Sequence, residues 1–171
     1  MYLIILIILI LGVFVVIGFN GLTSSRQKVN ESWADIDVQL KRRQDLIPNL
    51  IDTVKGYASH EETIFEHIAD IRTKAIALPL NDIEKKSEVE KDLENSTHQL
   101  LAIAESYPDL KASENFQKLQ QDLVNTEDEI ASARRIYNDN AANYNIKTSV
   151  FPTNLISVLC SLKPVNFFQN Q

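Results

Sequence analysis

This chain of 171 residues has few of the residues that interrupt helices or cross-link a fold: four glycines, five prolines and one cysteine. Scarce glycine and proline, beside abundant Lys, Glu, Asp, Gln, Leu, Ile and Ala, favour long helices. The single cysteine, Cys160, excludes a disulfide within the chain. The net charge is −6, and such an acidic balance argues against a nucleic-acid partner, because phosphate binding needs a basic face.

No charged side chain precedes Arg26, and residues 2–19 form an uninterrupted apolar run. As a helix this run is about 27 Å long, enough to cross the hydrocarbon core of a bilayer. A cleaved signal peptide would have a basic start, a shorter apolar core and a small-x-small cleavage site, and the sequence has none of these. We therefore predict a transmembrane anchor over residues 1–21, in contact with lipid through residues 2–19, and a soluble domain over residues 22–171.

The basic residues near the anchor all follow it, beginning with Arg26 and Lys28. Lys and Arg are enriched in the cytoplasmic segments that flank a membrane span. This bias predicts a single-pass membrane protein with its N-terminus outside and its soluble domain in the cytoplasm.

Beyond the anchor, apolar residues recur at spacings of three, four and seven, which predicts amphipathic helices. The first stripe runs from Val29 to Tyr57 and keeps its phase across Pro48, so we expect a kink there and not an end. The second helix is expected to begin at Ser59, which starts a capping box with an acidic residue three positions on, and to end at Pro79.

A third helix is expected to open at Asn81 or Asp82 and to stop before Pro108. A fourth carries an unbroken heptad stripe from Phe116 to Tyr144. The fold class predicted is all-α: an N-terminal transmembrane helix followed by an antiparallel, up-down four-helix bundle with long helices. One long coiled-coil homodimer is the alternative, and the proline breaks between the helices favour folding back.

The motifs that would indicate an enzyme or a cofactor site are missing. Di-iron bundles need Glu-x-x-His pairs, and none of His60, His67 and His98 follows a glutamate at that spacing. His60-Glu61 begins a His-Glu-x-x-His motif, but Ile64 occupies the second histidine position. Glycine-rich phosphate loops and Gly-x-Ser-x-Gly are absent. We predict no catalytic residues, no cofactor and no metal ligands, hence no enzyme.

Two polar clusters remain, each with a plain structural alternative. Charged residues on the first soluble helix are either a solvated face or a docking surface near the membrane, and asparagines late in the fourth helix either hydrogen-bond between helices or bind a ligand. For the asparagines we favour hydrogen bonding between helices. The candidate docking residues are Asp35, Asp37, Arg42, Arg43 and Asp52, and the candidate inter-helix polar residues are Asn140 and Asn143.

The tail, residues 150–171, is apolar but too short to span a membrane. We favour packing of this tail over one end of the bundle. The alternative is that Phe167 and Phe168 enter the bilayer interface or a groove of a partner. Cys160 is interpreted as a small packed residue and not as a reactive nucleophile.

Ordered segments with distinctive sequences occur along nearly the whole chain; among them are Glu31-Ser32-Trp33-Ala34-Asp35-Ile36-Asp37, Asp45-Leu46-Ile47-Pro48-Asn49-Leu50, Tyr107-Pro108-Asp109-Leu110, Ala133-Arg134-Arg135-Ile136-Tyr137-Asn138 and Phe151-Pro152-Thr153-Asn154. Together with the anchor they resemble the LemA family of bacterial membrane proteins. The resemblance implies one transmembrane helix, a helical-bundle domain and no established activity. It also implies a partner at the envelope, since family members occur beside membrane proteases and other membrane proteins.

Three functions are compatible with these observations. We favour a membrane-anchored, non-enzymatic interaction or scaffold module of the bacterial cell envelope, with a membrane protein or protease as partner. The alternative is a protein that binds a metal or small ligand in the bundle core. A purely structural oligomeric tether is the third interpretation.

Overall fold

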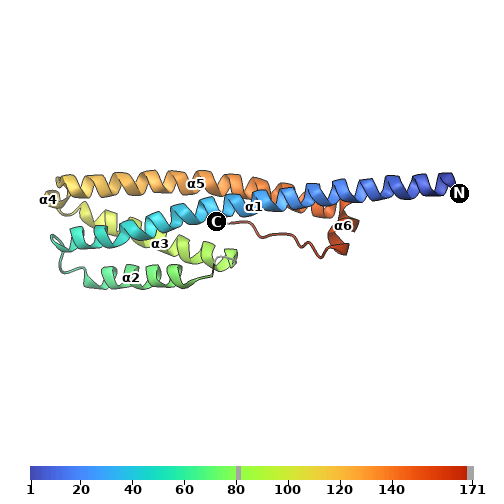
Figure 1. The fold of residues 1–171 in the computed structure, drawn as a ribbon. Coiled ribbons are helices and arrows are strands. Elements are labelled where there is room, and N and C mark those ends of the chain that lie inside the picture. Colours follow the sequence, from blue (N-terminus) through green and yellow to red (C-terminus); the bar gives the residue numbers. More distant parts are fainter. Residues whose placement is uncertain (80–81, 169–171) are drawn as a thin grey trace. The chain divides into compact units, whose positions relative to one another are not determined.

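The computed structural model describes residues 1–79 and 82–168, and within these ranges it contains six α-helices and no strand (Figure 1). The all-α class is therefore confirmed. The helices are α1 (Tyr2–Lys55), α2 (Glu62–Ala77), α3 (Ile83–Ala104), α4 (Pro108–Lys111), α5 (Glu114–Ser149) and α6 (Thr153–Leu159). The short helices α4 and α6 were not predicted.

Helix α1 is continuous from the apolar run into the polar part of the chain, so the predicted boundary at residue 21 lies inside one helix. The helix also continues through Pro48, as the unbroken phase of the stripe predicted. From Val29 to Val54 the stripe is buried except at Trp33, which is partly buried, and it does not include Tyr57, which is exposed beyond the end of the helix. Gly56 follows the last helical residue, and glycine is a poor helix former.

The predicted cap at Ser59 is wrong, because α2 begins at Glu62 with Glu61 in the capping position. The buried Ala58 starts a tight turn in which the Glu61 amide donates to the Ala58 carbonyl at 3.2 Å. Ser59 is exposed within that turn and lies too early to cap the helix. The predicted cap of α3 is confirmed for Asp82, whose side chain accepts from the Lys85 amide; the other candidate, Asn81, lies outside the described residues.

The described chain divides into two compact units. We call residues 1–34 and 135–167 the anchor unit, and residues 35–134 with Phe168 the central unit. Helices α1 and α5 contribute to both. In the anchor unit the two helices are antiparallel, because Lys147 Nζ donates to Ser25 Oγ at 2.6 Å while the rings of Trp33 and Tyr137 lie 5.5 Å apart.

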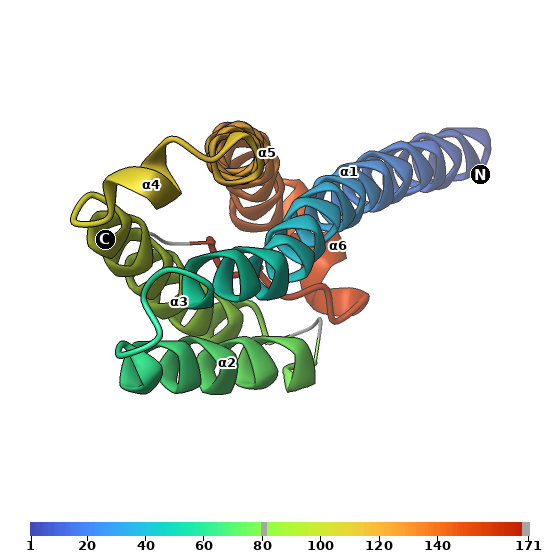
Figure 2. The same cartoon turned by 90° about the vertical axis from the view of Figure 1, so that its left-hand side faces the viewer.

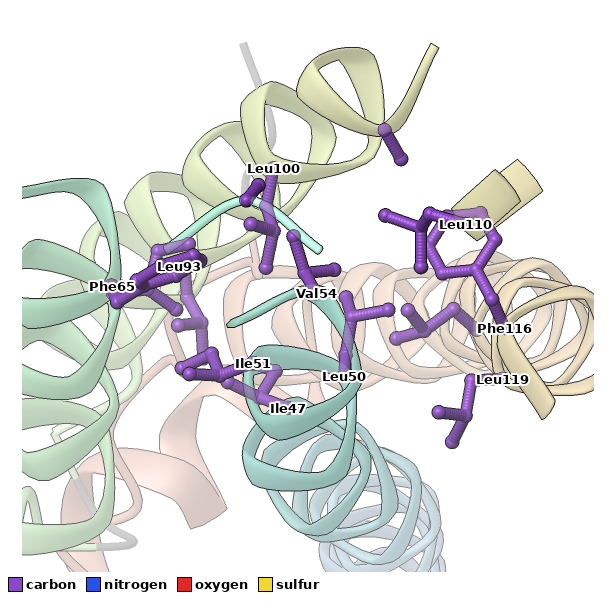
Figure 3. Close-up of a cluster of buried hydrophobic side chains, with 14 of the residues drawn as sticks. Ile47, Leu50, Ile51, Val54, Phe65, Leu93, Leu100, Leu110, Phe116 and Leu119 are labelled. Carbon is purple, nitrogen blue, oxygen red and sulfur yellow. The ribbon is translucent and has the colours of Figure 1, made fainter. Parts of the chain in front are cut away.

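The central unit has an apolar core to which α1, α2, α3, α4 and α5 all contribute. Helices α2 and α3 lie side by side in both orientations (Figures 1 and 2). Figure 3 shows the α1 side chains of this core between those of α2 and α3 on one side and those of α4 and α5 on the other. The labelled residues are Ile47, Leu50, Ile51, Val54, Phe65, Leu93, Leu100, Leu110, Phe116 and Leu119.

Candidate functional site

A network of charged side chains is buried in the central unit, around Arg43 of α1. The Arg43 side chain is 1% exposed. Its Nη2 donates to the Glu90 carboxylate and, at 3.1 Å, to the Glu90 carbonyl of α3. Its Nη1 donates to both carboxylate oxygens of Glu127 on α5, at 2.9 and 3.1 Å. One guanidinium thus joins three helices, and Gln44 adds a further donor to Glu90.

Arg43 is buried because it occupies a position of the apolar stripe itself. The buried residues of α1 follow steps of four and three through Ile36, Leu40, Arg43, Ile47 and Leu50. Burial disfavours the charged guanidinium, but the carboxylates of Glu90 and Glu127 outweigh this and raise the pKa of Arg43 above its usual value. Arg43 therefore stays charged in the core.

A second buried pair joins Asp37 of α1 to Lys86 of α3, whose ammonium lies 2.7 Å from the carboxylate. The more exposed Lys41 contacts the other carboxylate oxygen at 2.6 Å. Burial alone raises the pKa of Asp37, yet hydrogen bonds and charge from Lys41 and Lys86 lower it below its usual value overall. Both buried charges of this pair are therefore compensated.

Arg134 of α5 lies beside the Arg43 network and covers the ring of Phe168, with 5.4 Å between the guanidinium carbon and the ring centroid. Burial lowers the pKa of Arg134, and the charge of Arg43 adds to this, while Glu94 and Glu127 oppose it. Phe168 is 2% exposed. This side chain is therefore packed, whereas Phe167 is 41% exposed.

Packing of the whole tail over one end of the bundle stays a prediction. The interpretation of Cys160 as a packed residue is wrong, because this side chain is exposed at the end of α6, whose buried residues are Ile156 and Ser157.

The structure divides the predicted docking residues into two groups. Asp35, Arg42 and Asp52 are exposed, whereas Asp37 and Arg43 are buried in their ion pairs and offer very little accessible surface. Docking through the exposed residues stays a prediction.

The predicted inter-helix residues, Asn140 and Asn143, both lie in the anchor unit. Asn140 is partly buried and Asn143 is exposed, and their role stays a prediction. A neighbouring asparagine that we did not select makes a pair of backbone contacts instead: Asn145 Nδ2 donates to the Val165 carbonyl, and the Val165 amide donates back to Asn145 Oδ1, each at 2.9 Å.

Sequence reasoning also missed Lys86 and Glu90, the partners of Asp37 and Arg43. Their signal was present in the heptad spacing. Extending the stripe of α3 backward from Leu93 by steps of three and four reaches Glu90 and then Lys86. Val89, the apolar residue beside Glu90, is only partly buried.

The acidic groups of the network and of the Asp37–Lys86 pair are paired with donors. Their carboxylates are occupied by guanidinium, ammonium and amide donors. Among residues 1–79 and 82–168 no three His, Cys, Asp or Glu side chains are grouped so as to hold a metal ion. The groove between α3 and α5, lined partly by Glu94, Leu101 and Glu127, measures about 200 Å³. Two further grooves, one lined partly by His67 and Asp92 and the other partly by His98 and Phe116, measure about 400 and 410 Å³. The smallest groove is below the usual range of about 300–1,000 Å³ for small-molecule pockets, and the other two lie within it. Binding of a small ligand by this unit stays a prediction.

These features define an all-helical protein with a candidate membrane span and a central unit held together partly by buried ion pairs. Within the described residues, α1 is the one helix long and apolar enough to cross a membrane. The LemA family model matches residues 32–171, and the chain belongs to the LemA family. This confirms the resemblance drawn from the sequence.

Named relatives agree with this assignment. The chain is 30% identical over 167 residues to Protein LemA of Metamycoplasma hominis, covering 95% of this chain and 75% of that protein. It is 25% identical over 177 residues to Magnetosome protein MamQ 2 of Paramagnetospirillum magneticum. It is 24% identical to Magnetosome protein MamQ of Magnetospirillum gryphiswaldense. Both comparisons cover 90% of this chain, which spans 65% of the length of each MamQ relative.

Proposed function

We propose that the protein is a membrane-anchored interaction module of the bacterial inner membrane without enzymatic activity. The observation that carries this proposal is the continuity of α1. The same helix bears the exposed apolar run and, further along, the residues that organise the central unit. One continuous helix would thus join a bilayer anchor over residues 1–21 to the folded remainder, residues 22–171.

The arrangement we propose for the soluble part is an up-down four-helix bundle of α1, α2, α3 and α5. The antiparallel contacts of α1 with α5 support it, and so does the close packing of α2 with α3. Arg26 and Lys28, which follow the anchor, favour a cytoplasmic location for this bundle.

The surface proposed for a protein partner is the exposed face of α1 in the central unit. Asp35 and Arg42 are seven residues apart and therefore share one face of the helix. Val38 lies between them and is 61% exposed, and Asp52 continues the polar face toward the end of the helix. An exposed apolar side chain flanked by charges of both signs is suited to a membrane protein or protease partner that carries complementary charges.

Site-specific cross-linking in cell membranes tests this surface. A photo-activatable residue would replace Asp35, Arg42 or Asp52 in turn, with Asp70 of α2, which is also exposed, as the matched control. We expect discrete adducts with another protein from the α1 positions and few from Asp70. Adducts no stronger at Asp35 and Arg42 than at Asp70 would count against the proposal. The substitution Val38→Asp should weaken the α1 adducts without reducing protein abundance.

A further inference from the structure

Helix α6 presents an apolar face to solvent beside the candidate membrane span. Ile156 and Ser157 are its buried residues, and Ile156 Cδ1 is packed so closely on Gly18 of α1 that a Cβ there would overlap it. Thr153 of the same helix is also near this glycine, with its Cγ2 3.8 Å from that Cβ position. Helix α6 is thus seated on the last turn of the apolar run.

The opposite face of this segment is exposed. Val158 and Leu159 are 79% and 82% exposed, and Phe151 and Leu155 are 78% and 58% exposed. No charged side chain occurs between Lys147 and Lys163. Side chains of this size are seldom clustered on a surface that only water contacts. This cluster continues, in the same unit, the exposed apolar surface of the span.

The charge of the anchor unit differs from that of the rest of the chain. Counting side chains only, its five basic residues and two acidic residues give a net charge of +3, which leaves −9 for the other residues. A basic surface next to an apolar one matches an anionic membrane surface, where headgroups are negative and acyl chains lie directly beneath. The basic residues are Arg26, Lys28, Arg135, Lys147 and Lys163, and the acidic ones are Glu31 and Asp139.

We infer that α6 and Phe151 form a membrane-interface foot, which inserts into the leaflet where α1 leaves the bilayer. The occupant of the exposed face is the lipid of the same membrane that α1 crosses. This inference rests on the proposed anchor, because the contact of Ile156 with Gly18 places α6 beside the end of the proposed span. The foot would fix the depth and rotation of α1 at the surface, because it adds a second lateral contact to a single helix.

The native Cys160 gives a direct test, because it is exposed and caps the C-terminal end of α6. The full chain is placed at one copy per nanodisc, and a bimane fluorophore on Cys160 is challenged with lipids brominated on their acyl chains. We expect strong quenching that increases with the fraction of anionic lipid.

Two relocated probes in a Cys160→Ser background calibrate the result. Val13→Cys lies within the span and should be quenched, whereas Asn30→Cys is exposed about 16 Å further along α1 than Phe19 and should not be. Quenching at Val13 without quenching at Cys160 would leave the anchor intact and overturn the foot. Absence of quenching at both positions would overturn the anchor as well.

A matched pair of variants separates the foot from general surface effects. Val158→Asn with Leu159→Asn should sharply reduce quenching at Cys160, while Ile136→Asn should not; Ile136 is 52% exposed on α5 of the same unit, near the level of Trp33. Protection of Cys160 from a water-soluble quencher without quenching by bromolipid would show that protein atoms and not lipid cover this face, and it would overturn the inference.

Discussion

Replacing Arg43 by methionine should destabilise the fold by about 3–5 kcal/mol, the usual cost of removing one partner from a buried ion pair. The magnitude follows from the difference between its two main partners. The Glu90 side chain is 2% exposed and would lose its guanidinium partner while it keeps the amide of Gln44 as a donor. The Glu127 side chain is 26% exposed, so water replaces much of what it loses. Most of the lost stability therefore comes from leaving the buried Glu90 carboxylate without its guanidinium partner.

The neighbouring residue supplies the control. Arg42 is exposed, and Arg42→Met should change stability by no more than about 0.5 kcal/mol. Adding Glu90→Gln to Arg43→Met removes the buried charge but keeps an acceptor for Gln44, so most of the loss should be recovered. Urea unfolding of the full chain in mild detergent, followed by circular dichroism, measures all three. If Arg43→Met cost no more than Arg42→Met, the network would not stabilise the fold and the reasoning would be refuted.

Three further predictions follow from other contacts. The pKa of Asp37 is lowered in the folded state. Its contribution to stability is therefore complete above the unfolded pKa of about 3.9 and is lost as the pH falls through the lower folded pKa. Asp37→Asn should reduce the loss of stability in this acidic range, and an unchanged pH dependence would contradict this. Gly18→Ala should displace α6 and raise the mobility of a spin label on Cys160. Gly12→Ala should leave this mobility unchanged, because no atom lies near the Cβ position of Gly12. Equal label mobility in the two variants would show that α6 does not pack on Gly18. Asn145→Leu should cost about 1–3 kcal/mol locally and speed hydrogen exchange at the amide of Val165, and an unchanged exchange rate would argue against this clamp.

The sequence predicted the helices because their signals are local. The heptad stripe of α5 and the cap at Asp82 each depend on residues within a few turns. The start of α2 was misplaced because the capping motif at Ser59 competes with a turn anchored by the buried Ala58, and burial is set by the rest of the fold. A local motif indicates where a helix can begin or end, and tertiary packing determines which of these positions is used.

The buried network shows what pattern alone does not supply. The spacing from Leu40 to Ile47 already placed Arg43 on the core face, but a charged residue there is interpreted as solvated unless its partners are known. Those partners come from α3 and α5, 47 and 84 residues away. The paired hydrogen bonds between Asn145 and Val165 were also not predictable from the pattern. They join a side chain to backbone atoms, and such contacts produce no periodicity in the sequence.

The network also restricts how α1 pairs with the other helices. An apolar stripe with a seven-residue repeat remains apolar after a slide of one heptad, so its side chains alone define the register weakly. Such a slide would bring Ile36 or Leu50 opposite Glu90 and would leave that carboxylate buried without its guanidinium. The buried charges therefore penalise slipped registers far more than they stabilise the correct one.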